Sequence, residues 1–238
     1  MTIERQRPPL INQVRCRRMR RRIFPAMVAG IIALSAATLL WDVLRRAYAL
    51  PQETIDKALA SGSARILDRD GRAIAWRTAP DGCWRLPVRL SEISPRLAQA
   101  TLVAEDKRFW SHSGVDVPAA ARAMRQNLAS RRRISGASTI SMQVARLLEP
   151  HPRTLAWKLV EALRACDLEQ RLGKRRVLEL YLNLAPYGGN TIGAEAAAWR
   201  YFGKPAADLT FGEAALLAGI PQRPARFHPG RRLDQANQ

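Results

Sequence analysis

Twelve consecutive residues from Glu105 to Asp116 combine carboxylates, a histidine and aromatic side chains at the end of a segment with helical periodicity. Aromatic neighbours such as Phe109 can shield a carboxylate from water, and desolvation raises a carboxyl pKa toward values useful to a general base. Gly114 permits a turn within the cluster. Taken alone, the same composition more often belongs to a hydrogen-bonded helix terminus, so both interpretations stay open at this point.

A second cluster of chemically useful side chains runs from Ser135 to Gln143, where a glycine-containing turn leads into the start of a helix. Unpaired backbone N–H groups at a helix start attract anions. The three arginines at 131–133 precede this turn and could draw in a phosphate. Ordinary helix capping and a solvated basic run explain these residues equally well.

A third cluster pairs Lys158 with Glu161. Residues three apart share one face of a helix. The pair is either a surface ion pair worth about 0.2–1 kcal/mol or the charged wall of a cleft.

In this order, these segments resemble the motifs of the peptidoglycan glycosyltransferases. Those are the family-51 transglycosylase domains of class A penicillin-binding proteins and of their monofunctional relatives. The matching patterns are EDxxFxxHxGxD from Glu105, GxSTIxxQ from Gly136, KxxE from Lys158 and KxxVLxxYLN from Lys174. The resemblance covers about residues 63–229 and is greatest to the penicillin-binding protein 1C branch.

The resemblance implies a mainly α, lysozyme-like helical domain that polymerises lipid II into glycan strands and releases polyprenyl pyrophosphate. Glu105 matches the general base, which takes the proton from the acceptor hydroxyl in an inverting reaction. Glu161 matches the second catalytic carboxylate, near the pyrophosphate. The positions that match substrate-binding residues of the family are Asp106, Phe109, His112, Ser138, Thr139, Gln143, Arg146, Arg153, Lys158 and Asn183.

The resemblance also implies ligands and partners. No tightly bound cofactor is expected, with a divalent cation (Mg or Mn) at Glu161 as the alternative. The expected partners are lipid II, the nascent glycan chain, a membrane crossed once, and cell-wall synthesis proteins, with no nucleic acid.

Several departures from the family pattern keep other functions open. Ala137, Met142, Trp157 and Arg176 replace residues that are frequent in the family, and no Arg-rich fifth motif precedes Gln238. A second hypothesis is therefore a C-terminally truncated, non-catalytic homologue that binds lipid II or cell-wall partners. A third is glycan cleavage, which lysozyme-like folds perform with carboxylates, although the basic residues argue against it. The sequence has no S-x-x-K and no K-T-G, so it predicts no penicillin-acylated serine.

The N-terminal fifty residues indicate the compartment. The chain of 238 residues carries a net charge of +19, and residues 1–22 hold eight arginines against one glutamate. Residues 23–41 then contain no charge, and as a helix they span about 28 Å, close to the ~30 Å hydrocarbon core of a membrane. We predict a basic cytoplasmic tail (1–22), a transmembrane helix (23–44), a linker (45–62) and an extracytoplasmic domain (63–238) of the cytoplasmic membrane.

Two alternatives to the anchor are a buried core helix and a signal peptide cleaved after Ala47-Tyr48-Ala49. The predicted topology places the folded domain away from genomic DNA. Anionic lipid head groups and lipid-linked phosphates are therefore the expected partners of the basic charge.

The elements that position these motifs follow from periodicity and capping signals. Two short strands flank an Asp70-Gly71 turn within residues 66–76, and a third covers 84–88. Residues 51–62 are expected to be a polar connection. Helices are expected at 94–109, 118–130, 138–148, 154–173, 174–184, 193–202 and from 210 onward.

The three cysteines, Cys16, Cys83 and Cys166, exclude a disulfide-built scaffold, and none has the spacing of a zinc site. Whether Cys83 and Cys166 pair stays open at this stage. Cys166 falls on an apolar stripe with Leu155, Leu159 and Leu163, which predicts a core position.

Overall fold

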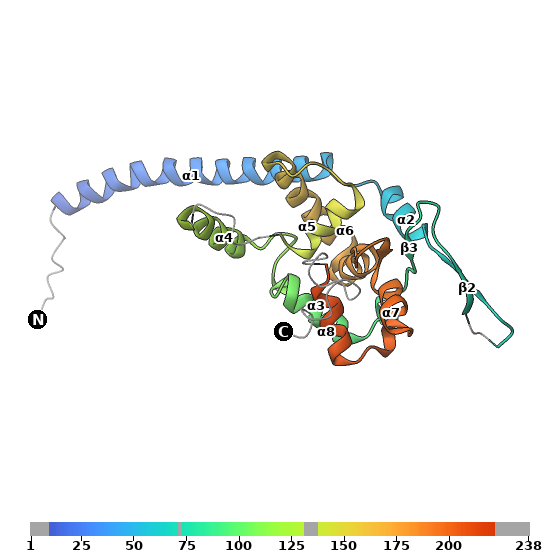
Figure 1. Cartoon of the computed structure of the whole chain (residues 1–238). Helices are drawn as coiled ribbons and strands as arrows, with labels where there is room; N and C mark the ends of the chain where they lie inside the picture. Colours follow the sequence, from blue (N-terminus) through green and yellow to red (C-terminus); the bar gives the residue numbers. More distant parts are fainter. Residues whose placement is uncertain (1–9, 71–72, 131–137, 222–238) are drawn as a thin grey trace, which may run out of the picture. The chain divides into compact units, whose positions relative to one another are not determined.

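The computed structural model describes residues 10–70, 73–130 and 138–221 (Figure 1). The chain forms two compact units, residues 1–47 and residues 48–238. Some residues of the sequence analysis lie outside these described ranges. They are Gly71 of the first turn, Arg131 to Arg133, the Ser135–Ala137 turn with Gly136, and residues 222–238.

The first unit contains one long helix, α1 (Leu10–Ala47). Its segment Met27–Ala47 is long and apolar enough to cross a membrane. The apolar side chains of this segment are exposed, as those of a lipid-facing helix must be. Length and composition alone fit a membrane anchor and an N-terminal signal sequence equally.

The second unit is mainly helical, which confirms the expected fold class. Its larger elements are α2 (Gln52–Ala60), α3 (Pro95–Glu105), α4 (Val117–Ser130), α5 (Ile140–Leu148), α6 (Leu155–Leu184), α7 (Ala194–Phe202) and α8 (Phe211–Gly219). The described part of this unit also contains the short 3₁₀ turns η1 (Leu90–Glu92), η2 (Phe109–Ser111) and η3 (Ala206–Asp208).

The β structure of the second unit is small, as expected. Strands β1 (Ala64–Leu67) and β2 (Ala73–Arg77) form an antiparallel hairpin. Strand β3 (Trp84–Arg85) is shorter than expected and pairs in parallel with β4 (Thr191–Ile192). The second pair brings together segments about a hundred residues apart, so it joins the N-terminal part of this unit to the start of α7.

Local capping explains where the helices begin. Pro95 occupies the first position of α3, and Thr210 and Glu213 form the expected capping box of α8. Helix α5 begins after Thr139 rather than Ser138, because the Thr139 hydroxyl accepts a hydrogen bond from the Met142 N–H at 3.2 Å. Thr139 is therefore the N-cap, and the side chain of Ser138 is left for another contact.

The boundary expected at Gly173 is present as a kink. The residue has φ 76° and ψ 160°, so α6 consists of two helical segments joined across it. A φ of this sign favours glycine. The two helices expected at 154–173 and 174–184 thus correspond to the two segments of α6.

The hydrophobic core lies where α5 packs on α6 and where α3 packs on α8. Its largest members include Phe109, Ile140, Leu168, Tyr181 and Tyr187, all at most 1% exposed. Helix α3 ends at Glu105 rather than near Phe109, because the chain turns at Asp106 and carries Phe109 into this core.

Two expectations about packing were wrong. The segment expected to be a polar connection contains helix α2, whose Ile55 side chain is 1% exposed and belongs to the core. On the predicted stripe of α6, Leu155 and Leu159 are 81% and 64% exposed. Apolar periodicity marks one face of a helix but does not show whether another element covers it.

The cysteines also differ in part from expectation. Cys166 is half-buried rather than a core residue, and its Sγ donates to the carbonyl of Ser113 at 3.0 Å. Cys83 and Cys166 form no disulfide with each other.

We predict that Gly114→Ala destabilises the second unit by roughly 2–5 kcal/mol. Gly114 has φ 91°, and a Cβ there would lie 2.5 Å from the backbone nitrogen of Cys166. Chemical unfolding of the detergent-solubilised chain measures the change. Gly212→Ala is the matched control, because no atom lies within 4 Å of its Cβ position. Equal stabilities of the two variants would contradict the prediction.

Candidate active site

A cavity of about 350 Å³ opens at the end of α3. Its wall contains Glu105 and Asp106 from the first motif and Ser138 and Thr139 from the second. The remaining wall residues are Val103, Ala104, Lys107, Arg108, Asp116, Ala119 and Arg122. The fold thus brings two of the sequence motifs to one site and adds basic side chains around the carboxylates.

Glu105 is the last residue of α3 and is half-buried in this wall. Its Oε2 accepts a hydrogen bond from Nε2 of Gln143 on α5, at 2.7 Å. Because the donor is on a different helix, the contact orients the carboxylate relative to the second motif. A half-buried, oriented carboxylate of this kind can accept a proton from a bound hydroxyl group.

Asp106 supports this arrangement through buried hydrogen bonds. Its Oδ2 accepts from the backbone N–H of Ile140 at 3.1 Å and lies 3.0 Å from Nε2 of His112. The carboxylate therefore joins the end of α3 to the start of α5. Asp106 lines the cavity, but its oxygens are already used in holding the backbone.

Phe109 and His112 were expected to bind substrate, and the structure places both behind the cavity wall. Phe109 is fully buried, and Nζ of Lys174 lies 4.4 Å from its ring centre. The His112 side chain is 6% exposed and contacts Asp106 on one side and Lys174 on the other. Neither residue lines the cavity.

The hydroxyl groups of Ser138 and Thr139, in the second motif, make different hydrogen bonds. The Thr139 hydroxyl donates to the carbonyl of Gly114 at 2.6 Å and caps α5. It therefore connects the first and second motifs. The Ser138 hydroxyl accepts a hydrogen bond from Nζ of Lys158 at 2.6 Å. Ser138 consequently links the cavity wall to the third motif.

Glu161 is buried in a group of basic side chains. Its Oε2 lies 2.6 Å from Nζ of Lys158, and its Oε1 lies 3.7 Å from Nη1 of Arg146 and 3.6 Å from Nε2 of His151. The Glu161 side chain is 4% exposed. Glu161 is therefore buried rather than at the surface, whereas the Lys158 side chain is 34% exposed. We call Lys158, Arg146 and His151, which surround the Glu161 carboxylate, the basic wall.

Three residues that sequence reasoning did not assign to the site belong near it. His151 stacks on Trp157 with ring centres 4.5 Å apart, and it faces Glu161. Tyr181 and Tyr187 are buried with no hydrogen-bond partner for their hydroxyls within the described ranges. Burial raises the pKa of both phenols, and the charge of Glu105 raises it further, so they remain neutral. The burial of both hydroxyl groups depends on tertiary packing, which the local sequence around Tyr181 and Tyr187 does not reveal.

Two expected substrate-binding residues lie elsewhere. Asn183 is buried, and its side-chain amide bonds the backbone N–H and carbonyl of Val88, each at 2.9 Å. It thereby holds the segment before α3 against α6. Arg153 is exposed in the connection before α6, with no ion pair to any residue that the structure describes.

The alternative of a divalent cation at Glu161 does not fit the side chains around this carboxylate. In residues 10–70, 73–130 and 138–221, no three His, Cys, Asp or Glu side chains gather in a metal-binding group. Glu161 is a lone carboxylate, and its nearest partners are basic, whereas Mg²⁺ prefers several oxygen ligands. We therefore assign no reaction step to a metal here.

The fold and this site agree with the comparison to known families. The chain belongs to the transglycosylase family, whose model matches residues 70–238. It is 48% identical over 172 residues to penicillin-binding protein 1C of Escherichia coli, a match that covers 72% of this chain. The branch expected from the sequence motifs is therefore among the relatives found.

Shorter relatives match as well. The chain is 45% identical over 160 residues to the biosynthetic peptidoglycan transglycosylase of Rhodospirillum centenum, covering 67% of this chain and 69% of that protein. It is also 45% identical over 141 residues to the protein of the same name from Klebsiella oxytoca. By contrast, it spans only 22% of penicillin-binding protein 1C.

We predict that the charge of Asp116 stabilises the fold fully at neutral pH and that this stabilisation is lost as the pH falls from about 4 toward 2. The hydrogen bond from Arg108, together with one from the Ala119 N–H, lowers the pKa of Asp116 from 3.8 to about 2. A lowered folded-state pKa stabilises the fold above the unfolded pKa, and this stabilisation is lost as the pH falls toward 2. Arg108 is half-exposed, so we expect about 1 kcal/mol rather than the full value of the shift.

The measurement compares unfolding free energies of the wild type and Asp116→Asn between pH 7 and pH 2. The difference should be constant above pH 5 and should vanish near pH 2. Asp56→Asn is the control for loss of a carboxylate charge at an exposed position, because the Asp56 side chain lies on the exposed face of α2. A difference that persists at pH 2 would mean that the charge of Asp116 is not its source.

Proposed function

We propose that this protein is a peptidoglycan glycosyltransferase that polymerises lipid II into glycan strands. One observation carries the proposal. Ser138 lines the cavity that holds Glu105, and it also accepts a hydrogen bond from Lys158, which pairs with Glu161. A carboxylate suited to proton removal and a basic wall suited to a diphosphate therefore adjoin the same space.

Glu105 acts as the general base in this proposal. Its carboxylate takes the proton of the acceptor sugar hydroxyl while that oxygen forms a bond to the anomeric carbon of the growing chain. The bond from this carbon to the diphosphate oxygen breaks, and the electron pair leaves with polyprenyl diphosphate. Attack opposite the leaving group inverts the configuration at the anomeric carbon. The hydrogen bond from Gln143 keeps the carboxylate in place for this step.

The basic wall stabilises the departing diphosphate. Negative charge on the bridging oxygen grows as the bond breaks, so fixed cations there favour the transition state over the ground state. Lys158 and Arg146 supply such charges, and Glu161 holds them in position through its buried carboxylate. Glu161 is thus proposed to orient cations rather than to transfer a proton.

Helix α1 is proposed as the membrane anchor of the enzyme. A basic tail favours the cytoplasmic side, which places the catalytic unit on the extracytoplasmic face of the cytoplasmic membrane. Lipid II is confined to a membrane, so an enzyme anchored there meets it at a high effective concentration. The nascent glycan chain and cell-wall synthesis proteins are the other proposed partners.

We expect Glu105→Gln to lower lipid II polymerisation by about 10²–10⁴-fold, because an amide cannot accept the proton. The assay measures polymer formed from purified lipid II by the full chain in detergent. Glu53→Gln is the matched control, since Glu53 is 75% exposed and pairs only with Lys57 among the described residues. The control should polymerise as the wild type does.

Two other outcomes have defined meanings. Equal polymer from the wild type and Glu105→Gln removes Glu105 from the catalytic role. A wild type that binds a lipid II analogue but makes no polymer supports the alternative of a non-catalytic lipid II-binding homologue. Release of soluble fragments from purified sacculi supports glycan cleavage instead.

We expect Lys158→Met to reduce polymerisation by roughly 10²–10³-fold, as loss of one fixed transition-state partner does in other enzymes. The variant also leaves the buried Glu161 carboxylate without its nearest cation. Circular dichroism therefore accompanies the assay, to check that the unit still folds. Lys57→Met is the control, because the Lys57 side chain on α2 is 75% exposed. Full activity of folded Lys158→Met would contradict a role for this cation.

A further inference from the structure

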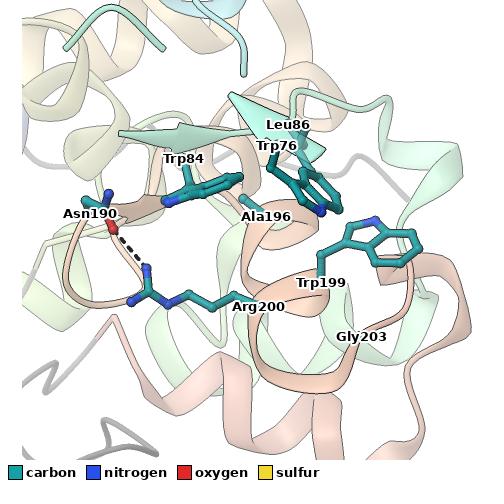
Figure 2. A pocket seen from close by; sticks show the side chains of 8 residues that line it. All are labelled: Trp76, Trp84, Leu86, Asn190, Ala196, Trp199, Arg200 and Gly203. Atoms are coloured by element: carbon teal, nitrogen blue, oxygen red, sulfur yellow. Dashed lines mark hydrogen bonds between the residues drawn. The ribbon is translucent and has the colours of Figure 1, made fainter. Parts of the chain in front are cut away.

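A second cavity, of about 500 Å³, lies between the hairpin and α7 (Figure 2). Three tryptophans line it: Trp76 from β2, Trp84 from β3 and Trp199 from α7. It shares no lining residue with the cavity that contains Glu105. A volume of this size is in the range of small-molecule binding sites. Neither the sequence motifs described above nor the proposed glycosyl transfer accounts for this cavity.

The indole rings form an aromatic wall rather than a part of the core. The ring centres of Trp76 and Trp84 are 5.8 Å apart, and those of Trp76 and Trp199 are 5.7 Å apart. All three side chains are half-buried, and none belongs to the buried core cluster. Figure 2 shows the three indole side chains around the cavity that they line.

Polar groups with free donors complete the wall. Nη1 of Arg200 donates to Asn190 and to Thr191, each at 2.8 Å, which fixes the guanidinium in position. In the described ranges, Nη2 of Arg200 and the indole N–H groups of Trp76 and Trp84 have no hydrogen-bond acceptor. The cavity thus offers apolar faces together with unused donors.

The charge around the cavity restricts the ligand. Arg200 is in the wall, and the guanidinium of Arg65 lies 5.8 Å and 5.1 Å from the ring centres of Trp76 and Trp199. These two positive charges disfavour a cationic ligand, although aromatic cages otherwise suit cations. A purely apolar ligand would leave the donors unpaired, which costs about 1–3 kcal/mol for each buried group.

We propose that this cavity is a second saccharide-binding site that holds a sugar unit of the glycan chain. A pyranose ring has apolar C–H faces for the indoles and a rim of oxygens for the donors. An acetamido or carboxylate substituent on the ring suits Arg200 in particular, since guanidinium groups bind carboxylates strongly. The choice of a glycan as the ligand rests on the proposed function, whereas the site itself is separate from the reacting groups.

The test uses the full chain in detergent micelles and a soluble β-1,4-linked N-acetylglucosamine tetrasaccharide. Tryptophan fluorescence and saturation-transfer NMR report binding without any turnover. The expected result is saturable binding by the wild type, with a dissociation constant raised at least tenfold in Arg200→Gln and in Trp84→Leu. Arg200→Lys, which retains the charge, should recover part of the affinity for a muramic acid-containing disaccharide, used as the carboxylate-bearing probe.

The controls separate this site from the proposed active site. Glu105→Gln and Trp41→Leu should bind the tetrasaccharide as the wild type does, and thermal unfolding should show that every variant is folded. The inference is overturned if the wild type does not bind the sugar, if Arg200→Gln and Trp84→Leu bind it unchanged, or if Glu105→Gln abolishes binding. It is also overturned if an apolar peptide, but not the sugar, quenches the fluorescence.

The polymerisation assay distinguishes failure of this inference from failure of the proposed function. Polymerisation without sugar binding at this cavity would reject the second site and leave the glycosyltransferase proposal intact. Sugar binding without polymerisation would support the second site and reject the glycosyltransferase proposal, because the protein would bind glycan without extending it.

Discussion

The proposed active site depends on the hydrogen bonds of the buried Asp106 carboxylate. A buried carboxylate needs hydrogen-bond partners, and Oδ2 of Asp106 reaches the backbone N–H of Ile140 only when the end of α3 lies against the start of α5. Glu105 precedes Asp106 in the chain, so this constraint also sets where the proposed base lies. The contact between Glu105 and Gln143 follows from the same approach of the two helices.

The basic wall follows from a second electrostatic constraint. Glu161 is almost fully buried, and burying a carboxylate requires compensating positive charge. Lys158 provides the nearest cation and also bonds Ser138, so neutralising Glu161 positions a positive charge beside the cavity. The net charge of +19 predicted an anionic partner. The structure shows part of that charge held by named contacts next to the candidate site.

Sequence reasoning succeeded where the determinants were local. The starts of α3, α7 and α8 and the break at Gly173 follow from proline, glycine and capping residues close in the chain. Sequence reasoning failed for features that depend on tertiary packing, such as which helix faces are buried. The segment expected to be a polar connection is a helix that packs on the core through Ile55. Leu155, which was expected on a buried stripe, is covered by no described element. Phe109 and Asn183 match family positions, yet their contacts are structural.

The two cavities differ in the chemistry they offer, and this difference suits a polymerising enzyme. The first combines carboxylates with basic groups, which matches proton removal and diphosphate departure. The second combines indole side chains with a fixed guanidinium, which matches a neutral or anionic sugar, and none of the described residues in its wall carries a carboxylate that could act as a base. A chain held by such a surface is retained without being cleaved. Because β2, β3 and α7 contribute the tryptophans of the second cavity, whereas α3, α4 and the two residues before α5 line the first, substitutions in the second cavity need not alter the proposed reacting groups.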